Sequence, residues 1–282
     1  MNSHPSGEPS PDTDMQVRPV YLAGRGDTAA IHEPLSATLG WGTVNTDTGL
    51  VFTSPRGDTL VASVPESRYG GWKVTQYREP LGMPVWSAAF SQNTPVEITS
   101  AFTRALTRGL PSNHRDFLHG GPHHQPTGPA RTLADRGWQT EDTAAYLYQH
   151  APDGHAYFRL CKDHLDDYTE LEGGGPAQWT MYGCVNEVNG ERWHADFTSA
   201  TPLYLIHEAA LALSSTDPVE RPFHAIPERN LPYITVLPAK AGPDPRRFAA
   251  LARTPNIPPT APASPATPPA DSPSVPATPR RR

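Results

Sequence analysis

The sequence has few of the residues that mark disulfide-stabilised, zinc-binding or membrane proteins. Cys161 and Cys184 are the only cysteines among 282 residues, too few for a disulfide framework and without the paired spacing of a zinc site. No segment approaches the roughly 18 consecutive apolar residues that span a bilayer. Residues 1–15 are polar and do not resemble a signal peptide. We therefore expect a cytoplasmic protein with no membrane contact and with two buried or half-buried thiols.

Motifs of nucleotide-hydrolysing and acyl-transferring enzymes are also missing. The sequence contains no G-x-x-x-x-G-K-[ST], no G-x-G-x-x-G and no G-x-S-x-G. In LIHEAAL, His207 and Glu208 begin a zincin-like pattern, but Leu211 stands where that motif requires its second histidine. The sequence therefore predicts no enzyme active site, no cofactor and no metal site.

Composition divides the chain into two regions able to fold and three that are too polar or too rich in proline. The last of these is built almost wholly of Pro, Ala, Ser and Thr and ends in Arg280–Arg282, which favours solvated, polyproline-like conformations. The predicted organisation is a disordered tail at 1–15, a first repeat at 16–111, a connector at 112–126, a second repeat at 127–235, an extension with a short helix at 236–253, and a disordered tail at 254–282.

The two apolar regions are copies of one sequence. A Gly-Trp pair recurs at an offset of 97 (138 minus 41), and the later tryptophans recur at an offset of 107 (193 minus 86). Ten residues are therefore inserted in the second copy, within KDHLDDYTELEGGG. The longest shared pattern is Trp-x-Ala-x-Phe followed by Thr-Pro, which indicates duplication of one structural unit. The signature pairs are Trp41 and Trp138, Trp72 and Trp179, Trp86 and Trp193, Phe90 and Phe197, Thr94 and Thr201, and Pro95 and Pro202.

Each copy combines β-prone runs with one well-marked helix. Two runs flank a Pro-x-Gly turn, which predicts a hairpin, and alternation places the aromatic residues of Trp-x-Ala-x-Phe on one face of a strand. In Thr94-Pro95-Val96-Glu97 we expect Thr94 to cap a helix and Glu97 to complete a capping box. The predicted fold is α+β: two tandem copies of a small antiparallel sheet packed by helices, each with a core of its own. Because Phe102 corresponds to Ala209, the two cores must be packed differently.

His194 and Asp196 are the candidates for chemistry. They stand two residues apart on the predicted solvent side of their strand, where they could act as an acid–base or metal-binding pair. The first copy has Ser87 and Ala89 in these places, so such chemistry would belong to the second copy alone. A polar, solvent-facing strand explains the pair more simply and is the preferred interpretation.

Two further polar clusters have simple explanations. The connector is rich in histidine but offers no scaffold for tetrahedral metal geometry, so we expect only adventitious metal binding there. The insertion is rich in carboxylates but lacks the spacing and central glycine of an EF-hand, so we interpret it as a solvated acidic loop. The histidines are His114, His119, His123 and His124, and the carboxylates are those of Asp163, Asp166, Asp167, Glu170 and Glu172.

Charge distinguishes the two copies and narrows the choice of partner. Residues 16–111 contain 8 Lys/Arg against 7 Asp/Glu, whereas residues 127–214 contain 5 against 13. An acidic second copy repels phosphate backbones, which argues against nucleic-acid binding by the folded part. The preferred hypothesis is a non-catalytic intracellular module that binds a protein or peptide. The alternatives are a metal-assisted enzyme in the second copy and nucleic-acid association through Arg280–Arg282.

The repeated features resemble an actinobacterial, streptomycete-type family known only as domain of unknown function three-one-seven. The matching features are YLAG at Tyr21–Gly24, Gly-Trp after a short helix, the Pro-x-Gly hairpin, and Trp-x-Ala-x-Phe with Thr-Pro. The resemblance covers residues 17–235 and implies tandem domains, an arrangement common in that family. Since the family has no assigned activity, the resemblance implies no catalytic, cofactor-binding or metal-binding residue.

Overall fold

The computed structural model describes residues 10–47, 49–64, 71–115, 127–173, 175–186 and 191–238. All of them lie in the first of the two units of the chain, Met1–Ala239. The predicted tail at 254–282, most of the connector and nearly all of the extension at 236–253 lie outside the described residues.

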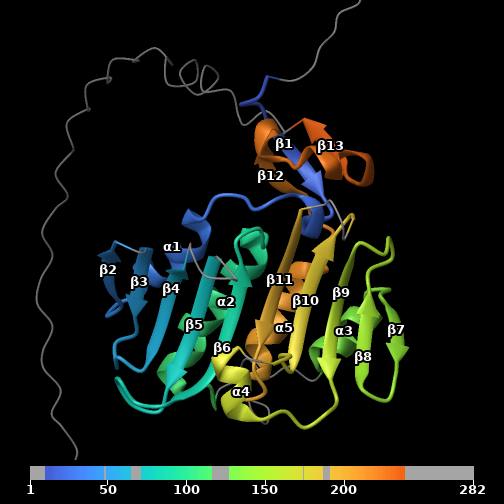
Figure 1. The fold of residues 1–282 in the computed structure, drawn as a ribbon. Helices are drawn as coiled ribbons and strands as arrows, with labels where there is room; N and C mark the ends of the chain where they lie inside the picture. Colours follow the sequence, from blue (N-terminus) through green and yellow to red (C-terminus); the bar gives the residue numbers. More distant parts are fainter. Residues whose placement is uncertain are drawn as a thin grey trace, which may run out of the picture. The chain divides into compact units, whose positions relative to one another are not determined.

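The two copies share one ten-stranded antiparallel sheet (Figure 1). The strand order is β2-β3-β4-β5-β6-β11-β10-β9-β8-β7, so each copy contributes one half and the pair β6–β11 is the junction. This arrangement confirms the α+β prediction. The first half comprises β2 (Gly42–Thr46), β3 (Gly49–Thr53), β4 (Thr59–Val64), β5 (Gly71–Tyr77) and β6 (Pro84–Ser91), and the second comprises β7 (Gln139–Asp142), β8 (Tyr146–His150), β9 (Ala156–Cys161), β10 (Trp179–Cys184) and β11 (Arg192–Phe197).

The register at the junction places a pseudo-twofold axis between β6 and β11. Positions 88–90 of the first copy are equivalent to positions 195–197 of the second, at the offset of 107 (195 minus 88). A half-turn about the central Ala89–Asp196 pair maps the junction onto itself. The duplicated chain therefore has the internal symmetry of an isologous dimer. The junction pairs are Phe90 with Ala195, Ala89 with Asp196, and Ala88 with Phe197.

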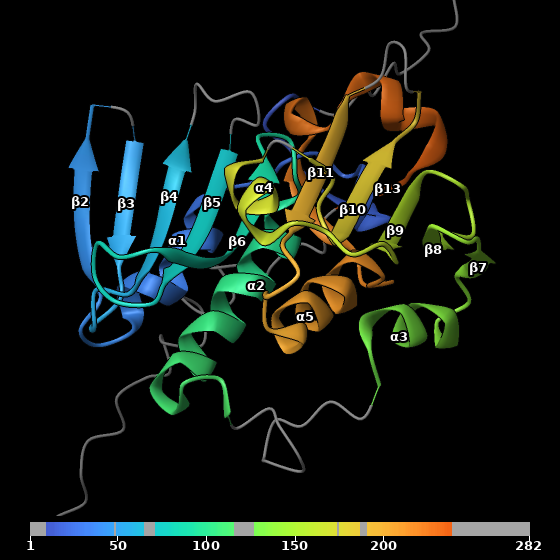
Figure 2. The same ribbon diagram turned by 60° about the horizontal axis from the view of Figure 1, so that its bottom comes forward.

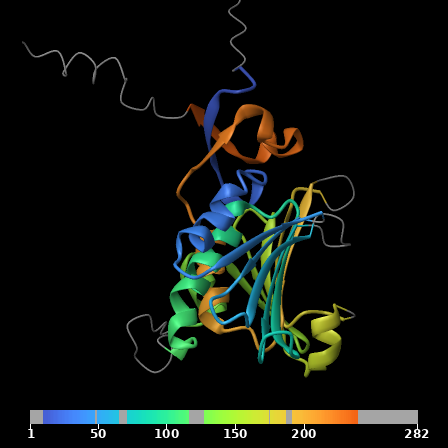
Figure 3. The same ribbon diagram turned by 90° about the vertical axis from the view of Figure 1, so that its left-hand side faces the viewer.

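In the described part of the chain, helices cover one face of the sheet and leave most of the other open (Figure 3). On the covered face the order α1-α2-α5-α3 again follows the twofold symmetry. On the open face the described residues place only α4 (Asp167–Glu172). No helix in the described part of the chain has the length and apolar character to cross a membrane. The covering helices are α1 (Ala29–Ala37), α2 (Val96–Gly109), α5 (Leu203–Leu213) and α3 (Pro129–Asp135), and short 3-10 turns lie at Val20–Leu22, Leu110–Ser112, Phe223–Ala225 and Glu228–Tyr233.

A second, three-stranded sheet joins the two ends of the described chain. Its order is β12-β1-β13, with β1 at Asp14–Arg18, β12 at Val219–Pro222 and β13 at Thr235–Pro238. Met15 and Val17 of β1 contribute to a small apolar cluster beneath it. The predicted boundary of the N-terminal tail is therefore wrong at residues 14 and 15, because strand β12 pairs with them.

One hydrophobic core serves both copies, so the prediction of two separate cores is wrong. Phe90 and Phe197 meet at the axis with ring centroids 5.6 Å apart. Phe102 of α2 lies 5.3 Å from the first ring and 5.7 Å from the second, so it belongs equally to both copies. Its counterpart Ala209 leaves room for it. The signature tryptophans Trp86 and Trp193 are likewise buried in this core.

The signature threonines do not cap the helices, which corrects the capping-box prediction. The N-caps of α2 and α5 are Pro95 and Pro202, and neither helix has a side-chain cap. The N–H of Val96 donates to the Arg25 carbonyl at 2.8 Å. Glu97 binds a distant arginine and does not fold back on its own helix.

The threonine hydroxyls instead tie each copy to the other across the axis. Thr94 donates to the carbonyl of His194 at 3.0 Å, and the hydroxyl of Ser91 accepts the N–H of that same residue at 2.9 Å. The twofold axis repeats this pattern. Thr201 donates to the carbonyl of Ser87 at 3.3 Å, and the hydroxyl of Thr198 accepts the N–H of Ser87 at 3.0 Å. The Thr-Pro signature thus satisfies backbone groups beside the junction.

Candidate functional site

The acidic insertion forms an ordered helix over the open face of the sheet, so the prediction of a solvated loop is wrong (Figure 2). Asp166 caps α4 by accepting the N–H and hydroxyl of Thr169 at 2.8 and 2.7 Å, and these hydrogen bonds lower the pKa of the Asp166 carboxyl. Glu170 is buried, and its carboxylate accepts the N–H groups of Gln178 at 2.6 Å and Ser199 at 3.0 Å. Glu170 therefore holds α4 in place through backbone donors, while the other carboxylates of the insertion are exposed.

A pocket of about 320 Å³ lies between α4 and the centre of the sheet. Its floor includes Lys73 of β5, Ala89 of β6 and Asp196 of β11, and Leu171 of α4 forms part of its wall. Because Ala89 and Asp196 are the pair on the pseudo-twofold axis, the pocket lies at the meeting point of the two copies. Among the described residues only the second copy places a helix over this face, so the insertion gives the cavity a wall on one side.

An apolar groove of about 290 Å³ continues from this pocket over the first copy. The groove and the pocket share Val64, Lys73, Ser87 and Leu171 as lining residues. Beyond them the groove crosses β4 and β5, where it is lined by Leu60, Ala62, Thr75 and Tyr77. The two hollows therefore form one continuous depression on the open face.

The copies have diverged on this face, as one row of paired residues across the sheet makes clear. In the first copy the row is apolar except for one lysine, whereas in the second copy it is polar or charged except for the aromatic ring of one tyrosine. A single ancestral surface has thus become two chemically different halves. The row runs from Val44 through Val51, Ala62, Lys73 and Ala89 to Asp196, Thr180, Arg159, Tyr148 and Glu141.

The structure places the two sequence-predicted candidates together on the open face. The Nε2 atom of His194 lies 3.8 Å from Oδ2 of Asp196, and each side chain is 29% exposed. The other carboxylate oxygen of Asp196 accepts the Thr180 hydroxyl at 2.8 Å, and Arg159 donates to that hydroxyl at 2.9 Å. Among the described residues no group of three His, Cys, Asp or Glu side chains is close enough to hold a metal. Asp196 lines the pocket, but His194 does not.

A belt of half-exposed aromatic side chains covers the second copy's open face, and sequence reasoning missed it. Tyr157 and Tyr182 are stacked with centroids 5.0 Å apart, and Tyr148 meets the first of these edge-on at 5.9 Å. The Arg159 guanidinium lies 5.1 Å from the centroid of Tyr146, within cation–π range. The alternation in YLYQH was the available signal, because alternate residues of a strand share a face.

Of the four connector histidines, His114 lies in the described part of the chain, and the other three lie outside it, as does Arg280–Arg282. His114 joins the copies by a 2.6 Å hydrogen bond between its Nδ1 and the hydroxyl of Tyr204. Its ring lies edge-on to Trp86 at 6.3 Å. Burial, reinforced by the nearby Arg56, lowers the pKa of His114 to about 4. The neutral ring is therefore a structural contact.

This depressed pKa predicts a specific sensitivity to acid. An unfolded histidine titrates near 6.5, so the stabilisation from neutral His114 is complete above that pH and is lost as the pH falls towards 4. We expect the wild type to lose about 2 kcal/mol more than His114→Gln between pH 7 and pH 4, allowing for solvent at the half-exposed ring. Urea denaturation at several pH values measures the difference. Buried His207, whose pKa is also lowered, titrates in both proteins. If the free energy of unfolding falls equally with pH in wild type and His114→Gln, His114 is not the source of the acid sensitivity.

Comparison with known proteins agrees with the division of the chain into two copies. No curated protein and no solved structure matches it. A family model does match, over residues 53–111 and again over residues 150–219. Each matched segment includes the Trp-x-Ala-x-Phe strand at the junction and the helix after Thr-Pro. The chain therefore carries two tandem matches to SPDY, a domain of unknown function (DUF317).

Proposed function

We propose that this chain is a binding protein without catalytic activity, and that the open face of its sheet receives a segment of a protein or peptide partner. The observation that carries the proposal is the continuous depression formed by the α4 pocket and the apolar groove. It crosses four neighbouring strands, from β4 to β11. At about 4.8 Å between strands this is about 14 Å, the length of about four extended residues.

The lining of the depression specifies the chemistry of the partner. Leu60, Ala62 and Val64 favour apolar side chains at the first-copy end. At the other end, Asp196 is partly exposed and the second copy carries an excess of carboxylates, which favours Lys or Arg. The adjoining tyrosine belt adds the kind of aromatic surface that is enriched in interfaces. We therefore expect a segment with an apolar stretch followed by a basic residue.

Binding is proposed over metal-assisted catalysis because of the contacts made by Asp196. Its carboxylate is held by Thr180 and faces His194 at 3.8 Å, so it belongs to a polar chain that ends in Arg159. Such a network of polar contacts fixes the charge of Asp196 on the open face of the sheet. Stoichiometric metal in untagged protein, lost in His194→Ala, would favour the catalytic alternative.

A peptide library displayed on phage and selected on the immobilised full chain tests this function. We expect the selected peptides to combine apolar and basic residues. Their binding should be lost in Thr75→Arg, which places a long cation in the groove, and retained in the control Arg104→Glu, on the outer surface of α2. Failure to select a common pattern, or peptides that bind Thr75→Arg as well as wild type, would overturn the proposal.

A further inference from the structure

Each copy has a pocket beside its Pro-x-Gly hairpin, and the two pockets are built from equivalent residues. The first is about 250 Å³ and the second about 330 Å³. Hairpin positions correspond at the offset of 97 (152 minus 55), and positions at the helix ends correspond at 107 (214 minus 107). The Gly-Trp and Pro-x-Gly signatures therefore form the same hollow twice. The equivalent lining residues are Trp41 and Trp138, Leu39 and Arg136, Pro55 and Pro152, Arg56 and Asp153, and Thr107 and Ser214.

A side chain from the other copy forms part of the wall of the second copy's pocket. Tyr21 reaches it from the start of the first copy and lies edge-on to Trp138 at 6.1 Å. Its hydroxyl donates to Asp153 at 2.8 Å, and burial together with this contact raises the pKa of the hydroxyl. The Tyr21 carbonyl accepts the indole N–H of Trp193 at 2.8 Å. Trp138 is consequently only 6% exposed.

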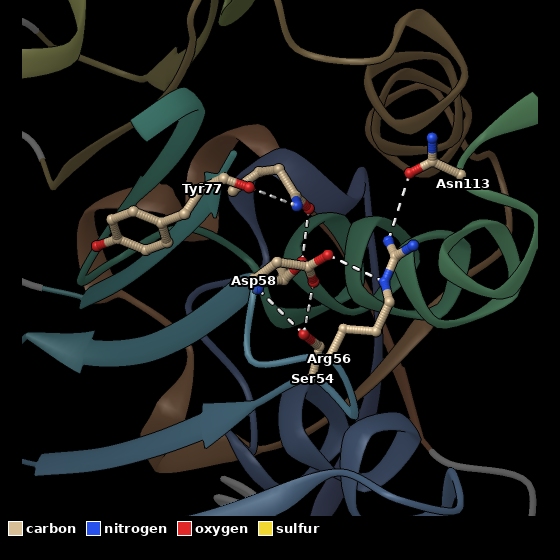
Figure 4. Close-up of polar contacts among 7 residues, drawn as sticks. Ser54, Arg56, Asp58, Tyr77 and Asn113 are labelled. Carbon is tan, nitrogen blue, oxygen red and sulfur yellow. Dashed lines mark hydrogen bonds and ion pairs between the residues drawn. The ribbon is translucent and has the colours of Figure 1, made fainter. Parts of the chain in front are cut away.

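Among the described residues, no tyrosine takes the equivalent place in the first copy. Trp41 is half-buried, and Leu39 at the pocket rim is 97% exposed. The connector contributes Asn113, whose side-chain oxygen accepts Arg56 Nη2 at 3.3 Å (Figure 4). Arg56 also pairs through Nε with Asp58 at 2.9 Å. Tryptophan and proline walls like those around Tyr21 are therefore present, with an arginine where the second copy has Asp153.

We propose that the first copy's pocket binds an aromatic side chain of a partner polypeptide, packed against Trp41 as Tyr21 packs against Trp138. Because Arg56 stands where the second copy has Asp153, the polar group that the ligand needs beside its aromatic ring is a different one. Asp153 accepts a hydrogen bond, whereas a guanidinium only donates, through five N–H groups. The matching ligand therefore carries a carboxylate beside its aromatic ring. This site shares no lining residue with the α4 pocket, so the two proposals stand or fall separately.

Two short probes test the site on the full chain. One is the acetylated, amidated tetrapeptide Pro-Val-Tyr-Leu, which copies residues 19–22, and the other replaces its leucine with glutamate. Titration is followed by the indole N–H resonances, with Trp41→Ala identifying the Trp41 signal. We expect both probes to shift this signal saturably, with the glutamate probe binding about fivefold to tenfold more tightly through a charge-assisted hydrogen bond.

Arg56→Gln distinguishes recognition by the arginine from general binding. This variant keeps the aromatic walls, so both probes should still bind and their affinities should become equal. Thr75→Arg, which blocks the groove on the open face, should leave both titrations unchanged. The proposal is overturned if the Trp41 signal does not move at millimolar peptide, or if the preference for glutamate persists in Arg56→Gln.

Discussion

Phe102→Ala is expected to lower the free energy of unfolding by about 3–5 kcal/mol, the range for a fully buried phenylalanine whose site cannot collapse. Phe102 is completely buried and contacts the junction phenylalanines of both copies. Its counterpart at the other side of the axis is already Ala209. The variant would therefore have alanine in both helices, with a cavity at the centre of the shared core.

Moving the phenylalanine to the other helix gives a sharper result. Ala209→Phe alone should cost about 1–3 kcal/mol through overpacking, because Phe102 already occupies the space near the axis. In the double variant Phe102→Ala/Ala209→Phe, the new ring should enter that same space from α5. We expect the double variant to be more stable than the sum of the two losses predicts, with a coupling of at least about 2 kcal/mol as neighbouring sites show.

Urea denaturation of the two single variants and the double variant measures this coupling. Phe52 provides the control, since it lies on β3, three strands from the junction, and packs on Trp72. Phe52→Ala combined with Ala209→Phe should be additive, as expected for sites without shared contacts. Additive losses in the Phe102 pair as well would mean that the two copies have separate cores.

The sequence predicted the parts of one copy better than the relation between the copies. Periodicity identified the buried aromatic face of Trp-x-Ala-x-Phe and a helix after Thr94, because both depend on neighbouring residues. It did not show that β6 pairs with β11, since an open sheet edge can pair with any strand of compatible register. The prediction that Thr94 caps its helix is wrong for the same reason: its acceptor, the His194 carbonyl, is 100 residues away.

The candidate site was predicted only in part. Alternation correctly placed His194 and Asp196 on the face opposite the aromatic residues. The ordered α4 was not foreseen, because Glu170 is held by backbone N–H groups that fold back from Gln178 and Ser199. A carboxylate-rich segment reads as solvated unless such donors are known. The pocket exists because these contacts hold α4 over the sheet, and they join residues that are distant in the sequence. No local sequence pattern therefore indicated it.

Arg221→Met is expected to cost about 3 kcal/mol, at the lower end of the range for breaking a buried ion pair, because Glu97 keeps some contact with solvent. The Arg221 side chain is 3% exposed and that of Glu97 is 29% exposed. Two guanidinium nitrogens donate to the Glu97 carboxylate at 2.8 and 2.7 Å. The pair ties β12 of the small sheet to the first turn of α2.

Hydrogen exchange shows which element depends on this pair. In Arg221→Met we expect faster exchange in β1 and β12, because the small sheet loses its bond to α2 while α2 stays packed in the shared core through Phe102. The neighbouring Glu220→Gln, on the exposed side of β12, serves as the control and should leave exchange unchanged. Had Glu97 served its own helix as a capping box, Arg221→Met would leave α2 untouched and Glu97→Ala would fray its first turn. Fraying confined to α2 in Glu97→Ala, with the small sheet protected in both variants, would restore the capping explanation and contradict the tie between the small sheet and α2.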